Sequence, residues 1–231
     1  MMSSIKRLIA IEGLDGSGKA TQTGLLYDRL TSKLIATRKV SFPVYESQSS
    51  ALVKMYLGGE ISQDPYAINA YGASSFYAVD RYASFLKDWR QDYLQGTTIL
   101  CDRYVCSNII HQMTKLDKSE WDSFIEWLFD YEHSKLGLPI PKATIFLTME
   151  LETSQRLMNS RYDNDPTKKD IHEKNVRYLE VCREAAMYAV KKLGWIEIKC
   201  CRNGVPLPIP VISDMVWEAL EGLFKGEGQN A

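Results

Sequence analysis

A glycine-rich loop near the start of the chain carries the clearest chemical signal in the sequence. Gly13 to Thr21 spell GLDGSGKAT, after the apolar run 8–11 and before a helical pattern. The glycines allow a tight turn that points backbone N–H groups at phosphate oxygens, the lysine adds positive charge, and the following helix offers its positive N-terminus. These residues predict a phosphate-binding loop.

One position departs from the usual pattern of such loops. The residue after the lysine is normally Ser or Thr, whose hydroxyl reaches the Mg²⁺ of a bound nucleotide, and here it is Ala20. Thr21 comes one residue later and points about 100° further round the helix. Magnesium would then be held mostly by phosphates, waters and another carboxylate.

A second group, Asp102-Arg103-Tyr104, directly follows the strand-like run 98–101. The Asp102 carboxylate could act on a water of Mg²⁺ or on the protons of an acceptor, and the Arg103 guanidinium could bind a phosphate through two hydrogen bonds. A structural ion pair is the alternative interpretation. The phosphate-binding loop earlier in the chain favours the functional one.

Tyr77 and Arg81 are four residues apart on a predicted helix and so share a face. An aromatic ring and a guanidinium can together stack on a base and bond its carbonyl edge. Periodicity alone favours a structural role for this pair. Asn108 and Gln112, which follow the Asp-Arg-Tyr triplet, carry amides that suit a base edge but are also ordinary groups on helix surfaces.

Five short apolar runs predict strands, and helical patterns lie between them. The strands fall at about 5–12, 39–43, 98–102, 143–149 and 195–200. The helices fall at about 18–34, 47–57, 66–95, 116–137 and 171–193, with Pro65 placed to open the third. This alternation predicts parallel crossovers in a doubly wound α/β sheet, with ligands bound beyond the carboxyl ends of its strands.

The composition suits one globular domain spanning 1–231. The chain has 231 residues, 45% of them hydrophobic, and a net charge of -1, which gives no electrostatic signature of nucleic-acid or membrane binding. The apolar run at the N-terminus is too short for a signal peptide or a membrane span, so we expect a cytoplasmic protein. Five cysteines without a CxxC pair indicate reduced thiols, and three histidines at no ligand spacing predict no protein-bound zinc.

The most polar segment, 159–174, precedes the last predicted long helix. One interpretation is a solvated surface loop. The other is a mobile lid over the phosphates, because the segment carries Arg161, Lys168 and Lys169.

Taken in order, the motifs resemble those of the thymidylate kinases, in the P-loop nucleoside monophosphate kinase group, over nearly the whole length. The motifs are the loop 13–21, Phe42-Pro43, the Tyr77 to Arg81 spacing, and 102–104 continued by Ser107-Asn108. The resemblance implies a three-layer α/β/α P-loop kinase fold with a five-stranded parallel sheet. It also implies a homodimer that transfers phosphate from ATP, with Mg²⁺, directly to dTMP, giving dTDP for dTTP biosynthesis.

The resemblance also implies roles for individual residues. It implies that the ATP phosphates are bound by Gly13, Gly16, Ser17, Gly18, Lys19 and Thr21. It implies that dTMP is bound by six residues: Asp15 contacts the sugar hydroxyl, Phe42 lies at the acceptor site, Tyr77 stacks on thymine, Arg81 contacts the base carbonyl, Arg103 binds the phosphate and Asn108 contacts the base. The catalytic residues would be Lys19, Asp102 and Arg161, with Asp102 also at the metal, directly or through water.

Some family members place a catalytic arginine in the phosphate-binding loop, which Gly16 excludes here. We therefore expect the charge to come from the lid, from Arg161 first, with Arg156 and Lys168 behind it. Two sites besides Ala20 depart from the family pattern. Val44-Tyr45-Glu46 replaces an arginine that binds the acceptor phosphate in many members, and His111 stands where an aromatic ring often crowds the sugar.

Two other functions stay open at this stage. One is a P-loop kinase acting on another nucleotide or on a nucleoside, and the other is a nucleotide-binding switch. A switch needs no second site that stacks a base, so the Asp102-Arg103 and Tyr77-Arg81 pairs argue against it. The aromatic-rich helix with Trp121, Phe124, Trp127 and Phe129 is either a plain core helix or a surface for the second subunit.

Overall fold

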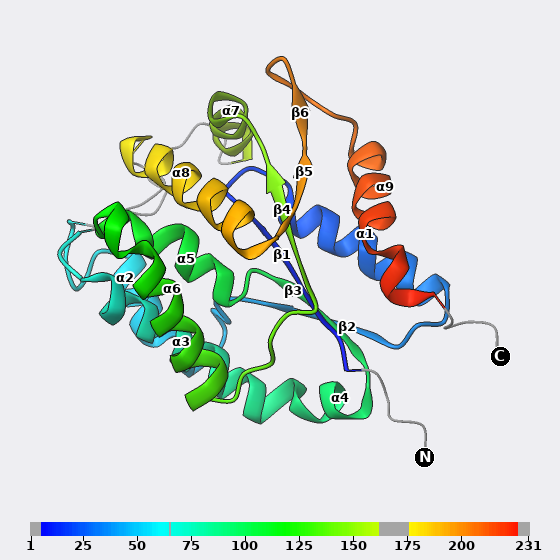
Figure 1. The fold of residues 1–231 in the computed structure, drawn as a ribbon, viewed down its shortest axis with the longest axis horizontal. Helices are drawn as coiled ribbons and strands as arrows, with labels where there is room; N and C mark the ends of the chain where they lie inside the picture. The colour runs from blue at the N-terminus through cyan, green and yellow to red at the C-terminus, as the bar shows by residue number, and fades with distance from the viewer. Residues whose placement is uncertain (1–5, 65, 162–175, 226–231) are drawn as a thin grey trace.

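Five parallel strands form the centre of the protein. The structure is a computed structural model, which describes residues 6–64, 66–161 and 176–225, without the side chains at 159–161 and 176. The strands are β1 (Leu8–Gly13), β2 (Thr37–Ser41), β3 (Thr98–Asp102), β4 (Ala143–Thr148) and β5 (Ile196–Lys199). Their order in the sheet is β2-β3-β1-β4-β5 (Figure 1). The predicted five-stranded parallel sheet is confirmed. Most strand ends lie within about two residues of their predicted positions.

Alternating side chains of the strands build two hydrophobic cores, one on each face of the sheet. Leu8 and Ala10 of β1 belong to one core, while Ile9 and Ile11 belong to the other. This division follows from the strand geometry, in which successive side chains point to opposite faces. Apolar residues at every position are typical of a parallel sheet covered on both sides.

Helices cover both faces of the sheet, which gives the three-layer architecture (Figure 1). The helices are α1 (Lys19–Ser32), α2 (Ala51–Leu57), α3 (Ala70–Ser84), α4 (Arg90–Gln95), α5 (Val105–Gln112), α6 (Trp121–Phe129), α7 (Leu151–Arg161), α8 (Val176–Leu193) and α9 (Ile209–Leu220). Helices α1 and α9 pack on one face, and α3, α5, α6 and α8 lie on the other. A short antiparallel hairpin, β6 (Cys201–Arg202) with β7 (Val205–Pro206), follows β5.

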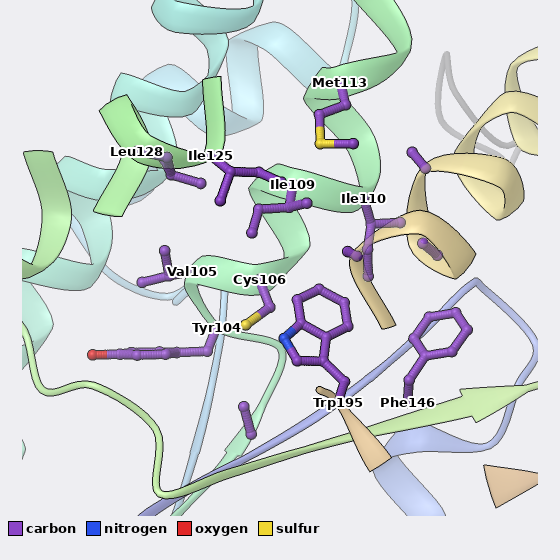
Figure 2. Packing of buried hydrophobic residues seen from close by; sticks show 14 of the residues in the cluster. Tyr104, Val105, Cys106, Ile109, Ile110, Met113, Ile125, Leu128, Phe146 and Trp195 are labelled. Atoms are coloured by element: carbon purple, nitrogen blue, oxygen red, sulfur yellow. The ribbon is translucent and has the colours of Figure 1, made fainter. Parts of the chain in front are cut away.

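Helix α5 lies at the centre of the larger core (Figure 2). Ile109 lies beside Ile125 of α6, while Phe146 of β4 lies 6.4 Å from Trp195 between ring centroids. Most of the side chains of α5 are buried. The sequence did not predict this helix, because a short segment buried nearly all round lacks the one-sided periodicity of a surface helix.

The predicted helix 66–95 is wrong in its start, whereas residues 70–95 are helical throughout. It begins only at Ala70, because Asn69 caps it by accepting a hydrogen bond from the Gly72 N–H at 2.8 Å. A π-helical turn, Phe85–Trp89, then separates α3 from α4. Helices α7 and α9 and the hairpin were also not predicted.

Two other expectations concern the surface. Trp121 and Phe124 of α6 are buried in the larger core, which favours the core interpretation of that aromatic-rich helix. None of the helices in the described ranges combines the length and apolar character that a bilayer span requires.

Candidate active site

The loop between β1 and α1 has the backbone geometry that the sequence predicts. Gly16 and Gly18 have positive φ angles of 81° and 87°, in the left-handed region that other residues avoid. A Cβ at Gly16 would lie 2.4 Å from the carbonyl oxygen of Ser154 in α7. Gly16 is therefore required by its conformation and also by the close approach of α7 to the loop.

Lys19, the first residue of α1, folds back over this loop. Its Nζ donates a hydrogen bond to the Leu14 carbonyl at 3.0 Å and lies 3.8 Å from the Asp15 carboxylate. Burial, followed by the positive charge of Arg103, lowers the pKa of Lys19 to about 8, although the nearby carboxylates oppose this shift. Lys19 is thus a buried cation at the position where a phosphate-binding lysine is expected.

The parallel pairing of β1 and β3 brings Arg103 beside the loop. Ile11 pairs with Asp102 in the sheet, so both strands end at the same edge. Arg103 then forms an ion pair with Asp15 of the loop. Burial alone would lower the pKa of Arg103, but the carboxylates of Asp15, Glu12 and Asp102 outweigh it and raise the pKa, so the guanidinium stays charged.

A buried glutamate, Glu12, fixes the turn that carries Arg103. Its two carboxylate oxygens accept hydrogen bonds from the Tyr104 N–H at 2.7 Å and from the Ser107 hydroxyl at 2.6 Å. These bonds help to hold Arg103 at a φ of 67°, a conformation that is rare outside glycine. Burial raises the pKa of Glu12, whereas its hydrogen bonds lower it. Sequence reasoning missed this role, although one charged residue inside the apolar run of β1 was a usable signal.

Arg81 and Asn108 meet at a second glutamate that the sequence analysis also missed. Glu132 is fully buried and accepts hydrogen bonds from Arg81 Nε at 2.7 Å and Nη2 at 2.6 Å. The Asn108 amide donates to the same carboxylate at 3.0 Å and to the Ser74 carbonyl at 3.2 Å. The structure therefore joins two predicted base-binding residues in one buried network. Glu132 lies about 50 residues from Arg81 in the chain, so no local pattern could have identified it.

Two other residues predicted for the acceptor site, Tyr77 and Phe42, make contacts with aromatic rings. Tyr77 is partly buried, with its ring edge-on to Tyr56 at 6.4 Å between centroids. Phe42 directly follows β2 and is buried, 6.0 Å from the Tyr104 ring. Phe42 contributes to the core beneath the strand edge, so any contact of its side chain with a ligand would be limited.

Asp80, next to Arg81 on α3, holds the loop that follows Phe42. Its buried carboxylate accepts hydrogen bonds from the Val44 N–H at 2.8 Å and the Ser49 hydroxyl at 2.6 Å. Tyr45 in this loop lies close enough to Arg103 to affect its pKa. The loop thereby becomes part of the same edge of the sheet.

The side chains near the phosphate-binding loop fit a magnesium ion that is held partly by the phosphates of a bound nucleotide. Among the described residues, no group of three or more His, Cys, Asp or Glu side chains could hold a metal by itself. Mg²⁺ keeps several waters and is usually bound by one or two carboxylates together with substrate phosphates. Asp102, at the end of β3, could supply that carboxylate, while Thr21 is exposed in the first turn of α1.

The residues predicted for the lid are placed only in part. Arg161 is the last residue of α7, and its side chain lies outside the described residues, as does all of Lys168. Arg156, also on α7, donates a hydrogen bond to the Gly204 carbonyl of the hairpin at 3.0 Å. The rest of the predicted lid, 162–174, also lies outside the described ranges.

The site combines a glycine loop, between the first strand and first helix of a parallel sheet, with a buried lysine and a guanidinium at the same edge. This combination defines a P-loop phosphotransferase. Comparison with known proteins narrows this class. The chain belongs to the thymidylate kinase family, whose family model, described as thymidylate kinase, matches residues 11–202.

Individual relatives agree with this assignment. The chain is 29% identical over 194 residues to a thymidylate kinase of Mycobacterium tuberculosis, covering 81% of this chain and 87% of the relative. It is 28% identical over 156 residues to one of Caenorhabditis elegans, covering 64% and 65%. The solved structure of a Candida albicans thymidylate kinase superimposes with a TM-score of 0.68 at 22% identity, covering 94% and 92% of the two chains, which supports the fold.

Proposed function

We propose that the protein transfers the terminal phosphoryl group of ATP to dTMP, giving dTDP, by direct in-line displacement. The observation that carries this proposal is the position of Arg103. Its guanidinium pairs with Asp15 of the phosphate-binding loop, beside the buried Lys19. Two cationic groups for two phosphates thus stand at one edge of the sheet, as transfer between two bound anions requires.

On the donor side, the backbone N–H groups of residues 13–18 and the positive end of α1 would bind the ATP phosphates. Lys19 would leave the Leu14 carbonyl and neutralise charge on the group in transfer. Asp102 would hold Mg²⁺, directly or through water. When bound, Mg²⁺ neutralises charge on the phosphates of the donor.

On the acceptor side, Arg103 would bind the dTMP phosphate and Asp15 the sugar hydroxyl. The network at Glu132 suggests how the base could be recognised. Glu132 occupies Nε and Nη2 of Arg81 and one N–H of Asn108, so Arg81 Nη1 would donate to a base carbonyl and Asn108 Oδ1 would accept from a base N–H. Tyr77 would stack on the ring.

Gln112 is a further candidate for the base site. Its Oε1 is buried without a hydrogen-bond partner among the described residues, and it lies four residues after Asn108, on the same face of α5. A buried acceptor without a donor is unfavourable, and a base N–H would satisfy it.

A coupled assay of ADP release tests the proposed function. We would compare dTMP with dUMP, UMP, CMP, AMP, GMP and thymidine as acceptors, and with no acceptor. We expect dTMP to be strongly preferred and ATP hydrolysis without acceptor to be slow. Preference for another acceptor would reject the substrate but keep the phosphotransferase class, and turnover independent of any acceptor would favour a nucleotide switch.

The pKa of Lys19 leads to a pH prediction. Because deprotonation removes the charge that binds ATP, kcat/KM for ATP should fall as the pH rises through about 8, by up to tenfold per pH unit. Bound phosphate stabilises the protonated lysine, so kcat at saturating ATP should persist to higher pH. Initial rates between pH 6.5 and 10 would measure both profiles.

The matched control is Lys19→Arg, whose guanidinium stays charged throughout this range and should abolish the fall in kcat/KM. Lys115, whose pKa burial also lowers to about 8, is intact in that variant. A fall that persists in Lys19→Arg would therefore be assigned elsewhere, to Lys115 for example, and would contradict the role of Lys19.

We propose that residues 159–174 act as a lid that closes over the phosphates of this single domain and that Arg161 supplies its catalytic charge. Arg161→Ala should then lower kcat by about 100-fold or more, the effect of losing one transition-state cation. Arg156→Ala is the matched control, because Arg156 already binds the Gly204 carbonyl. Single-turnover rates should show the loss in the Arg161 variant alone, and the reverse result would transfer the role to Arg156.

We also propose that the protein is a cytoplasmic homodimer. Support for a second copy comes from exposed apolar side chains on α2, on α3 and in the following turn, including Leu52, Val79 and Leu86. Support for the location comes from the five cysteines, which are all free. Light scattering would test the first point, and the mass of a single chain would contradict it.

A further inference from the structure

His111, in the last turn of α5, lies between Arg103 and α8. Its Nε2 is 3.3 Å from Arg103 Nη1. A guanidinium has only donors, so Nε2 must be the acceptor of this hydrogen bond. The imidazole is then neutral, with its proton on Nδ1.

The other side of the ring agrees with this tautomer. The Tyr178 hydroxyl donates its single proton to the His111 carbonyl at 3.0 Å. The same hydroxyl oxygen lies 3.4 Å from His111 Nδ1, so it accepts the Nδ1 proton. The Cys182 sulfur, one turn further along α8, lies 3.6 Å from Nδ1. Tyr178 and Cys182 are fully buried, whereas the His111 ring is partly exposed, so the α8 side of this arrangement is the one enclosed by the protein.

Arg103 is thereby held from two directions. Asp15 binds Nη2 from the phosphate-binding loop, and His111 binds Nη1 from α5. A flexible arginine side chain loses conformational freedom when it binds a phosphate, and two partners that hold it in advance reduce that loss.

We propose that His111 is a positioning residue for the acceptor: its neutral ring, with the proton on Nδ1, orients the Arg103 guanidinium toward the dTMP phosphate and connects it to the first two turns of α8. This inference rests on the proposed function of Arg103. It is specific to a histidine, because a phenyl ring in this position could not accept the hydrogen bond.

Two substitutions separate the two sides of the ring. In His111→Gln, the amide oxygen can reach the position of Nε2 and accept from Arg103, whereas in His111→Asn the shorter amide reaches only the position of Nδ1. We expect His111→Asn to raise the KM for dTMP about tenfold or more, the effect of losing a hydrogen bond to a charged group, and His111→Gln to stay within about threefold. The KM for ATP should stay unchanged in both.

The thermal midpoint of each variant would show whether it folds. Equal KM values for dTMP in the wild type and both folded variants would overturn the inference, as would equal losses in both. If the wild type itself does not phosphorylate dTMP, the proposed function fails instead, so the two failures are distinguishable.

A spectroscopic measurement tests the tautomer without relying on a folded variant at position 111. Long-range ¹H–¹⁵N spectra of the histidine-labelled wild type, free and with dTMP, should show His111 with its proton on Nδ1. Tyr178→Phe removes the acceptor of that proton and should shift the tautomer signal. A proton on Nε2, or an imidazolium at neutral pH, would contradict the proposal.

Discussion

Replacing Glu132 by alanine should lower the free energy of unfolding by about 3 to 5 kcal/mol, because it leaves the buried Arg81 guanidinium without its counter-charge. Arg81 is 1% exposed and Glu132 is 0% exposed, and two hydrogen bonds of 2.6 and 2.7 Å join them. A domain is stable by only about 5 to 15 kcal/mol, so this loss is a large fraction of the total. Thermal and urea unfolding, followed by circular dichroism, would measure it.

Two controls make this prediction specific. The exposed pair of Lys118 and Glu184 has side chains 66% and 52% exposed, and Glu184→Ala should change the stability by less than about 1 kcal/mol. The double variant Arg81→Met with Glu132→Ala removes both charges and should recover much of the loss. A Glu132→Ala variant as stable as Glu184→Ala would show that the buried pair contributes little.

Arg103→Ala should raise the KM for dTMP by roughly 30- to 900-fold, which corresponds to a loss of about 2 to 4 kcal/mol, while the KM for ATP changes far less. The guanidinium is held at the acceptor side by Asp15 and His111, so its removal leaves the phosphate of dTMP without its cation. Initial rates with each substrate varied in turn would measure both constants.

The conformation of Arg103 dictates the controls for this experiment. Its φ of 67° disfavours alanine, so Arg103→Gly provides a variant without that backbone strain. Arg38→Ala removes an arginine of β2 that pairs with Asp88 and Asp92, and it should leave the KM for dTMP unchanged. Equal effects of Arg103→Ala on dTMP and ATP would contradict an acceptor role.

The phosphate-binding loop could be predicted from the sequence because its chemistry is local. The glycines, the lysine and the following helix are neighbours in the chain, and their function depends on backbone conformations that those residues adopt. The strands were equally accessible, since each is a short apolar run between polar segments. Helix α5 was not predicted, because its burial depends on β4, α6 and α8, which contact it from distant parts of the chain.

The second half of the candidate site depended on contacts between distant segments. Tyr77, Arg81 and Asn108 were singled out by spacing and residue type, and their roles at the base came from a family resemblance; neither source points to Glu132, which binds two of them. Glu12 was visible only as a charge within an apolar strand, whereas its partners lie about 90 residues away. The fit of dTMP to these residues stays a prediction, which the acceptor assay tests.

The sequence alone determined the class of fold, the anion-binding loop, the five strands and several of the helices between them, because propensity, hydrophobic alternation and glycine conformation act over a few residues. Only the tertiary structure decided which charges face each other. Parallel pairing of β1 with β3 places Arg103 against Asp15, and the packing of α3 and α5 against the turn after α6 brings Arg81 and Asn108 to Glu132. Electrostatic partners act through space, at distances of a few ångströms that bear no relation to their separation along the chain.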